Sequence, residues 1–434
     1  MNQFGLYLEA LRRPFRKLAK LEFLQPDNSV AFSIDNNYKR GYMSRYDTRA
    51  FLQNGNLNVS LQNGQRRQAT VTLANRDNAF DYAVNHVWFG SRIRLSMGLV
   101  LPSGKEFYLP QGVFYIQNPQ SVFAPDSREI TYNLVDKWSY LDGTLFGILE
   151  STYRIDKSTD GVKTNIFDAM RSLLRLSRFD LSSGEVDITR MIDCVEPIFT
   201  DYYNGRNYDL EGGGTAAMTD VPYDIIVNSD GGAIADLMLE LCETVAGIIG
   251  YDPCGALRVE PSQDDISDSE KPILWHFSVG DGQLLRVTDT AKNAEVYNDV
   301  IIIGEGLEDG NVYGRATNFD PNSDTNVNLI GKKTWREAKA SYWNATQCMD
   351  LAEWYLKRKT VLQKSITIET SQMFHLMENR LVSVERIDKP GSPIERHIIQ
   401  SFTLPIGESG SMSINATSVA DTPVITTTSS ALGE

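Results

Sequence analysis

The sequence has 434 residues, 41% of them hydrophobic and 10% aromatic, and a formal net charge of −14 at pH 7. This length is more than one hydrophobic core usually serves, and the apolar content excludes a disordered chain. The acidic balance argues against broad nucleic-acid binding, which needs clustered Lys and Arg, and no apolar run approaches the roughly 20 residues that span a bilayer.

The N-terminal segment, "LYLEALRRPFRKLAKLEFL" at 6–24, is basic, whereas the chain as a whole is acidic. Its apolar residues recur at helical spacing, and Pro14 interrupts the pattern. Its basic residues are Arg12, Arg13, Arg16, Lys17 and Lys20. A basic amphipathic stretch can lie on a membrane surface. Because this one is short, kinked and followed at once by a strand, we expect residues 1–24 to dock on an acidic partner or on the protein's own body.

A first β domain is expected over residues 25–150. Short segments with mostly alternating apolar residues occur there, separated by turn sequences such as "QNGN" and "PSGK". They are a strand beginning at Val30, then Leu57–Leu61, Ala69–Leu73, Ile93–Met97, Glu106–Leu109, Val113–Ile116 and Ile130–Leu134. So many short strands, without a long helix between them, predict a barrel or sandwich.

The pattern changes over residues 151–255, where we expect a mixed α/β domain inserted between two β units. "TNIFDAMRSLLRL" at 164–176 places apolar residues on one helical face. Residues 232–249 do the same and end at Gly250, where a C-terminal cap belongs. A polar, tyrosine-rich loop separates these two predicted helices.

A second β domain is expected over residues 256–417, with a long packed helix over 335–358. "NDVIIIGEG" at 298–306 predicts one arm of a hairpin and "GRATN" its return. The helix is predicted from one apolar stripe, formed by Trp335, Ala338, Tyr342, Ala345, Met349, Ala352 and Leu356. The basic run "KRK" at its end suits the negative end of the helix dipole, and β-branched residues then favour a strand.

Three further strands, Leu381–Ile387, Ile394–Leu404 and Met412–Thr417, are expected to complete the second β unit around that helix. "DKPGSP" at 388–393 predicts the turn between two of them. The Thr- and Ser-rich remainder, 418–434, lacks a packing face. We expect it to be a flexible tail that orders only against a neighbour.

No segment carries the signature of a catalytic, cofactor or metal site. The four histidines occur singly, and HExxH, GxSxG and P-loop sequences do not occur. The four cysteines lack metal-type spacing and are expected to be reduced. "DPNSDTN" at 320–326 is like the start of a calcium loop, but Thr325 and Gly331 stand where that loop needs glycine and glutamate. We expect no enzyme activity, cofactor or metal, although a glycosidase carboxylate pair is assembled in space and leaves no sequence signature.

Several long stretches together resemble one family of proteins. They are "KLEFLQPDNSVAFSI", "NGNLNVSLQNGQRRQATVTLANRDNAF", "WFGSRIRLSMGLVLPSGKEFYLPQGVFYIQNP" and "ITYNLVDKWSYLDG". "GYDPCGALRVEP" after the second helix, and "YNDVIIIGEG" with the late helix and strand, add to the set. Over residues 18 to 404 the chain resembles the baseplate hub proteins of tailed bacteriophages, which share architecture more than signature residues.

The resemblance implies a homotrimer in which two tube-type β-barrel domains per subunit form a pseudo-sixfold ring. The β units over 25–150 and 256–417 look like those tube domains. In this family the ring joins the sixfold tail tube to a threefold spike or tip. The implied partners are the tail tube or distal tail protein, the central spike or tip protein, and the tape measure protein. The implied location is the baseplate or tail tip of a virion, after synthesis in the host cytoplasm.

The hub interpretation comes with two expectations about the protein surface and two alternative functions. The five basic residues of the N-terminal segment are expected to contact a neighbouring tail protein and not a membrane. The channel wall is expected to be acidic or neutral, so that DNA passes without being held through its phosphates. Any wall-degrading activity would belong to another chain. A receptor- or glycan-binding tail protein is the first alternative, because β-rich chains with many tyrosines suit glycans, and a glycosidase is the second.

Overall fold

Two units make up the fold in the computed structural model. Unit 1 comprises Met1–Arg286, Ile368–Ile394 and Ile399–Ile414, and unit 2 comprises Val287–Thr367, Glu395–Ile398 and Asn415–Glu434. The residues that the structure describes are 3–25, 29–36, 52–75, 78, 80, 84, 87, 91–125, 128–176, 207–209, 214–217, 219–228, 230–245, 247–260, 272–292, 296–305, 310–339, 342, 345–360, 363–407, 410–418 and 425–431. None of the helices formed by these residues is long and apolar enough to cross a membrane.

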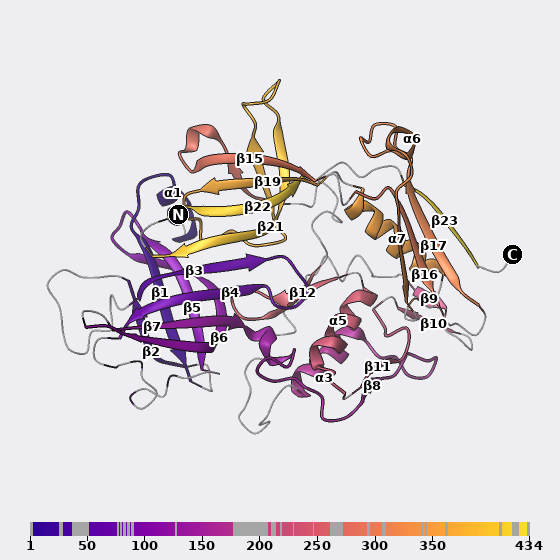
Figure 1. The fold of residues 1–434 in the computed structure, drawn as a ribbon, viewed down its shortest axis with the longest axis horizontal. Helices are drawn as coiled ribbons and strands as arrows, with labels where there is room; N and C mark the ends of the chain where they lie inside the picture. The colour runs from indigo at the N-terminus through magenta and orange to yellow at the C-terminus, as the bar shows by residue number, and fades with distance from the viewer. Residues whose placement is uncertain are drawn as a thin grey trace. The chain divides into compact units, whose positions relative to one another are not determined.

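Unit 1 is built on a large β-sheet (Figure 1). Its N-terminal strands are β1 (Lys17–Leu24), β2 (Val30–Asp35), β3 (Leu52–Ser60), β4 (Arg67–Ala74), β5 (Arg92–Val100), β6 (Glu106–Phe123) and β7 (Arg128–Asp136). Its later strands are β14 (Ile273–Phe277), β15 (Leu284–Lys292), β19 (Gln363–Thr370), β20 (Leu381–Glu385), β21 (Ile394–Ile406) and β22 (Met412–Ser418). The order is β15-β19-β22-β21-β3-β4-β7-β6-β5-β1-β2, with β20 joining β14 to β21. Strands β15, β19, β21 and β22 contain residues assigned to both units.

The prediction of a mainly β chain is confirmed, and the predicted strands of residues 25–150 are present as β2 to β7. The strands expected at Glu106–Leu109 and Val113–Ile116 are one continuous strand, β6. Opposite it on β5, Leu95 pairs with Gly112 but Ser96 pairs with Pro110, so β6 carries one extra residue in a bulge. The intervening "PQG" therefore bends the strand instead of ending it.

The expected amphipathic stretch at 6–24 is wrong in its second half. A helix, α1 (Gln3–Leu11), ends before Pro14, and Lys17–Leu24 then forms β1. This strand lies between β5 and β2 and pairs antiparallel with both. Its residues largely alternate between buried and half-buried, as a strand with one face on the core requires. Pro14 therefore separates two elements and does not kink one helix.

Strands from the two predicted β domains lie side by side in unit 1. Residues Ser401–Ile406 of β21 pair antiparallel with Gly55–Ser60 of β3 (Figure 1). Leu57 and Val59 on β3, and Phe402 and Leu404 on β21, are buried. The sheet is thus continuous across a gap of more than 300 residues in the sequence, and pairing at this junction joins its two halves.

The middle of the chain forms a mixed α/β part of unit 1, as predicted. Its elements are the 3-10 helix η1 (Lys137–Tyr140), β8 (Tyr153–Ile155), α3 (Ile166–Leu176), β9 (Asn207–Asp209), β10 (Thr215–Ala217), β11 (Ile225–Val227), α5 (Ile234–Thr244), β12 (Ile248–Tyr251) and β13 (Leu257–Glu260). Helices α3 and α5 share one buried core, which includes Met170, Leu237 and Leu241. The second predicted helix, 232–249, ends earlier than expected, because Ile248–Tyr251 pairs with β13.

Unit 2 contains a small sheet with a helix packed on it. Its elements are β16 (Asp299–Gly304), β17 (Val312–Asn318), α6 (Val327–Ile330), β18 (Thr334–Lys339), α7 (Ala345–Lys359) and β23 (Ile425–Ala431). The strand order is β18-β16-β17-β23. The hairpin predicted from "NDVIIIGEG" and "GRATN" is confirmed, because β16 and β17 pair antiparallel.

The predicted helix over 335–358 is wrong in its first part. Thr334–Lys339 is strand β18, which pairs in parallel with β16, and the helix α7 begins only at Ala345. Trp335 and Ala338 have helical spacing, but the residues of "TWREAK" alternate between exposed and half-buried. Pairing with β16 favours the strand over the helix for these residues. The predicted passage from this helix into a strand is confirmed, since α7 is followed by β19.

Two other expectations about this region are also wrong. The strands at 381–387, 394–404 and 412–417 belong mainly to unit 1, whereas α7 packs on β16, β17 and β23 in unit 2. Residues 425–431 of the expected flexible tail form β23, which pairs antiparallel with β17. The Thr-rich sequence has high β propensity, and the edge of β17 supplies hydrogen-bonding partners from the same chain. Residues 419–424 and 432–434 of that tail lie outside the described residues.

Helix α7 approaches β17 so closely that only glycine fits at one position. A Cβ atom on Gly314 would lie 2.2 Å from the backbone nitrogen of Met349 and 2.3 Å from the backbone carbon of Cys348. Across the β16–β17 pair, Ile302 lies opposite Gly314 and is buried. The missing side chain thus lets the helix backbone rest directly on the sheet.

Replacing Gly314 with alanine should destabilise unit 2, because the added methyl group would push α7 off the sheet. Overpacking of this kind costs about 1–3 kcal/mol. We expect a lower urea midpoint and faster hydrogen exchange in α7. Gly161→Ala is the matched control, since a Cβ at Gly161 meets nothing within 4 Å. Equal effects of the two substitutions would contradict the close-approach argument.

Candidate functional site

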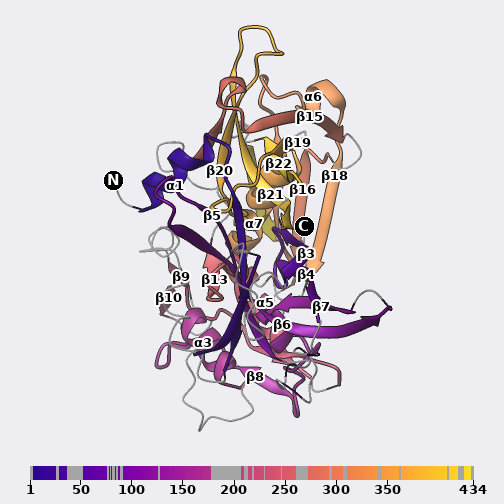
Figure 2. The same cartoon turned by 90° about the vertical axis from the view of Figure 1, so that its left-hand side faces the viewer.

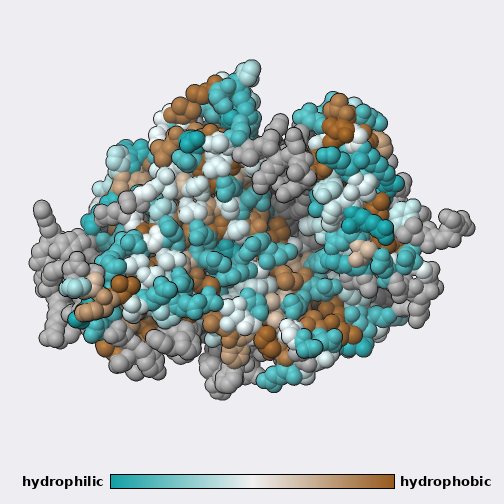
Figure 3. Space-filling view, viewed as in Figure 1, coloured by the Kyte–Doolittle hydropathy of each residue, from teal (hydrophilic) through white to brown (hydrophobic). Residues whose placement is uncertain are grey.

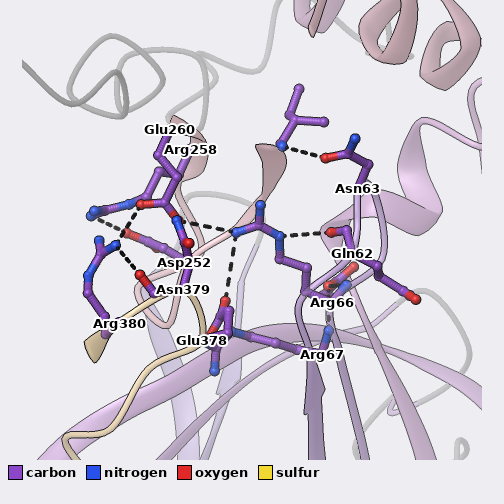
Figure 4. A network of polar contacts seen from close by, with 12 residues as sticks. Gln62, Asn63, Arg66, Arg67, Asp252, Arg258, Glu260, Glu378, Asn379 and Arg380 are labelled. Carbon is purple, nitrogen blue, oxygen red and sulfur yellow. Dashed lines mark hydrogen bonds and ion pairs between the residues drawn. The ribbon is translucent and has the colours of Figure 1, made fainter. Parts of the chain in front are cut away.

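Charged side chains gather inside unit 1, around the loop that joins β3 to β4 (Figure 4). They come from three separate stretches of the sequence. The members are Arg66 and Arg67 at the start of β4, Asp252, Arg258 and Glu260 on the β12–β13 hairpin, and Glu378 and Arg380 just before β20. The side chains of Arg66, Arg67, Glu260 and Glu378 are at most 3% exposed. We call these seven residues the buried charge cluster.

Positive and negative groups alternate through the centre of this cluster. Arg67 Nη2 lies 2.5 Å from Glu378 Oε2, and Arg66 Nη1 lies 3.8 Å from the other oxygen of the same carboxylate. Arg66 Nη1 also lies 3.6 Å from Glu260 Oε1, and Arg380 Nη1 lies 3.0 Å from Glu260 Oε2. Each carboxylate is therefore held between two guanidinium groups.

Backbone hydrogen bonds tie the cluster to the surrounding elements. Arg67 Nη1 donates to the carbonyl of Gln111 at 3.1 Å, and Arg66 Nε donates to the carbonyl of Gln62 at 3.0 Å. The side-chain oxygen of Asn63 accepts from the backbone nitrogen of Ile249 at 2.9 Å, at the edge of the mixed α/β part. The same loop of β3–β4 thus touches both the sheet and the inserted part.

Asp136 anchors this loop from the end of β7. Its Oδ2 accepts from the backbone nitrogens of Arg66 and Arg67, both at 2.9 Å, and its Oδ1 accepts from that of Trp138 at 3.0 Å. Burial raises the pKa of Asp136 to about 6, although these donors oppose the shift. Burial also acts to raise the pKa of Glu378, but Arg67 and Arg66 outweigh it and hold that pKa below its ordinary value.

The cluster holds structure together and offers no open site for chemistry. Its central charges are removed from solvent and paired with one another, although Arg66 Nη2 and Arg67 Nε have no hydrogen-bond partner among the described residues. Among the described residues, no group of three His, Cys, Asp or Glu side chains is placed to hold a metal ion. Removing one partner of a buried ion pair is far more costly than the pair is stabilising. The three stretches are therefore fixed in one relative arrangement.

The N-terminal helix α1, drawn in indigo in Figure 2, is held against the rest of unit 1 by a second polar contact. The hydroxyl of the buried Tyr7 accepts from the backbone nitrogen of Phe374 at 3.0 Å and lies 3.0 Å from His375 Nδ1. Aromatic rings of Phe4, Phe107 and Trp275 pack around the pair. Burial lowers the pKa of His375 from 6.5 to about 4, so the neutral ring can accept the Tyr7 proton.

The five basic residues predicted as a partner contact lie in two adjoining segments of the chain. Arg12, Arg13 and Arg16 are exposed and lie between α1 and β1. Lys17 and Lys20 lie in β1, where Lys17 Nζ donates to the carbonyl of Gly410 at 3.1 Å and Lys20 Nζ lies 2.6 Å from Glu22 Oε1. Arg13 pairs with Glu9 at 3.2 Å on the surface. The structure thus leaves three arginines exposed between α1 and β1 and places two half-buried lysines in β1.

The comparisons with known proteins rest on structure. No protein-family model matches the sequence, and no curated protein matches it. The tail protein of Neisseria meningitidis MC58 matches with a TM-score of 0.55 and 10% identity, over 93% of this chain and 96% of that one. The 43 kDa tail protein of prophage MuSo2 from Shewanella oneidensis matches with a TM-score of 0.56 and 10% identity, over 92% and 98%. The chain has the fold of phage tail proteins.

A chain of the Francisella PdpA–VgrG complex also matches, with a TM-score of 0.51 and 8% identity. The match covers 95% of this chain but 54% of that one, so this tail-protein fold spans about half of the longer chain. The resemblance to phage tail hub proteins drawn from the sequence is therefore confirmed at the level of the fold.

Sequence reasoning missed the buried charge cluster of this tail-protein fold. "RR" at 66–67, a glutamate at the end of a short strand and "ENR" at 378–380 are ordinary in isolation. The one local hint is that Arg67 opens a strand whose alternating residues are buried. The calcium-like loop at 320–326 is occupied by its own hydrogen bonds, since Asp320 Oδ1 accepts from the backbone nitrogen of Asn322 at 2.9 Å.

Replacing Glu378 with glutamine should destabilise unit 1 strongly, because Arg66 and Arg67 would lose the carboxylate between them. Breaking a buried pair on one side costs about 3–5 kcal/mol. Chemical unfolding should show this as a lower urea midpoint. Asp156→Asn is the control, because it removes the carboxylate of the exposed Arg154–Asp156 pair. An exposed ion pair contributes only about 0–1 kcal/mol to the free energy of unfolding. A Glu378→Gln variant as stable as the control would show that the cluster does not fix the three stretches in place.

The neutral state of His375 should make unit 1 acid-sensitive. Because the folded-state pKa of His375 lies below the unfolded value of 6.5, its contribution is complete above that pH and is lost as the pH falls from 6.5 towards 4. Between pH 7 and 5 this loss amounts to about 2 kcal/mol. His375→Gln should reduce the fall in unfolding free energy by about that amount. The same fall in the variant and the wild-type protein would contradict the assignment.

Proposed function

We propose that this protein is a structural component of a phage tail or tail-like particle, and that it acts as a baseplate hub. The observation that carries the proposal is the match to two tail proteins along nearly the whole of each chain, 93% against 96% and 92% against 98%. The fold is thus shared end to end and not through one common module. The role is structural and not enzymatic, and the buried charge cluster serves to keep the shape of unit 1.

The arrangement of the sheet supports assembly with further copies. Within the described residues, the sheet path begins at β15 and ends at β2, so each end strand has one neighbour along it. Such edges invite pairing with another chain, and native proteins cover them. We infer that three copies close into a ring in which these edges are covered, because a closed ring leaves no contact surface unused.

In that ring the subunits would join the sixfold tail tube to a threefold spike or tip and surround the DNA channel. A channel wall that is acidic or neutral suits the net charge of −14, since a basic wall would bind phosphates and slow the passage of DNA. The exposed Arg12, Arg13 and Arg16 are proposed to contact a neighbouring tail protein. They carry positive charge at a surface where an acidic partner would be attracted.

A cryo-electron microscopy reconstruction of the assembled particle tests this proposal. We expect three copies around the tail axis, a lumen without a lining of Lys and Arg, and Arg12, Arg13 and Arg16 at the contact with another tail protein. A single copy bound to the outside of the particle would contradict the hub role. A ring lined by basic side chains would contradict the proposed channel, and a zymogram showing that the purified chain degrades peptidoglycan would contradict the structural role.

A further inference from the structure

The segment between β17 and β18, residues 319–333, is a loop held rigid by buried polar side chains. We call it the α6 loop. Asn298 Nδ2 donates to the carbonyl of Thr325 at 3.0 Å and to that of Gly331 at 2.8 Å, and its Oδ1 accepts from the backbone nitrogen of Lys333 at 2.7 Å. Asn326 Nδ2 donates to the carbonyl of Asp320 at 2.6 Å. Asn298, just before β16, thus fastens the middle and the C-terminal end of the loop, and Asn326 fastens its N-terminal end.

A third asparagine completes this framework. Asn318 Nδ2 lies 2.9 Å from Ser323 Oγ and 3.0 Å from Thr325 Oγ1, and Thr325 Oγ1 donates to the carbonyl of Thr360 at 2.8 Å. Asn298, Asn318 and Thr325 are all buried. Because buried polar groups are costly unless paired, the loop has one strongly preferred conformation. Docking on it would therefore cost little conformational entropy.

This rigid loop leaves large apolar side chains in water. Leu329 is 70% exposed, Phe319 46% and Ile330 41%. Figure 3 shows hydrophobic atoms at the surface of the part of unit 2 that carries α6. A single exposed apolar residue is ordinary, but three on one preorganised loop are typical of a contact surface.

Positive charge follows these apolar residues directly. Lys332, Lys333 and, on β18, Arg336 are exposed, and two of them have intrachain partners, since Lys332 Nζ lies 3.4 Å from Asp299 Oδ2 and Arg336 Nη2 lies 3.9 Å from Glu305 Oε1. The chain as a whole has a net charge of −14. Two copies of so acidic a protein repel each other, so a contact between them is favoured where cations are concentrated. The α6 loop combines such cations with apolar surface. The same loop carries Asp320 and the exposed Asp324, which disfavour an anionic lipid surface.

We propose that the α6 loop is a contact surface for a second copy of this chain. Leu329, Phe319 and Ile330 pack against apolar surface of the neighbouring copy, and Lys333 faces its carboxylates. The inference rests on the proposed function, in which several copies assemble, and it adds which surface of unit 2 they use. Contacts of this kind depend on a small number of buried apolar anchors.

Sedimentation velocity of the full-length protein over a concentration series tests the contact. Leu329→Ser should raise the dissociation constant for self-association at least about tenfold. Val162→Ser is the matched control, because Val162 is 66% exposed and lies in unit 1, and it should leave the constant unchanged. Lys333→Glu should weaken association more at about 50 mM salt than at about 500 mM, where surface charges are screened. Unchanged thermal unfolding in each variant would show that the fold is kept.

The outcomes separate this inference from the proposed function. A wild-type protein whose self-association survives Leu329→Ser overturns the α6-loop contact and leaves the hub role standing. A wild-type protein that stays monomeric overturns both the contact and the ring, while a tail location in the reconstruction would still support a tail role. Binding of the wild-type protein to phosphatidylglycerol vesicles that is lost in Leu329→Ser would assign the loop to a membrane and overturn the inference.

Discussion

Arg66 and Arg67, held against Glu260 and Glu378 in the interior of unit 1, are the contacts on which the rest of that unit depends. Taking an ion out of water costs several kcal/mol, and the mutual attraction of the charges offsets this only when every partner is in place. The cluster therefore adds little net stability to a correctly folded chain. It destabilises other arrangements of the chain, because any arrangement that lacks one of the three stretches leaves a buried charge without its partner.

The same dependence explains how the large sheet and the mixed α/β part are joined in unit 1. Arg67 begins β4, and the loop before it is fastened to Asp136 at the end of β7 and to Ile249 on β12. Gly64 in that loop donates its backbone nitrogen to the carbonyl of Ile249 at 3.0 Å, and a Cβ on Gly64 would lie 2.9 Å from the Trp138 indole nitrogen. Charge, backbone pairing and close packing thus fix the same junction.

The sequence predicted those parts of the fold that depend on local periodicity. Strands β2 to β7, helices α3 and α5 and the β16–β17 hairpin follow from spacing within ten or so residues, which a pattern of apolar positions records directly. It mispredicted Thr334–Lys339 because Trp335 and Ala338 fit a helix and a strand equally well, and only pairing with β16 separates the two. The charge cluster could not be predicted at all, since Arg67 and Glu378 meet across 311 positions and neither has a local signature.

Unit 2 uses a related device without sharing any residue with unit 1. Asp299, at the start of β16, is fully buried, and its carboxylate lies 2.8 Å from Arg315 Nε on β17. It also accepts from Thr317 Oγ1 and Thr334 Oγ1, each at 2.7 Å, so one carboxylate fastens β16 to both of its neighbours. In each unit the buried charges hold strands in register and do not activate a group that faces solvent. A frame of this kind keeps the shape of each unit fixed, because directional polar contacts resist sliding between strands better than apolar contacts, which are non-directional.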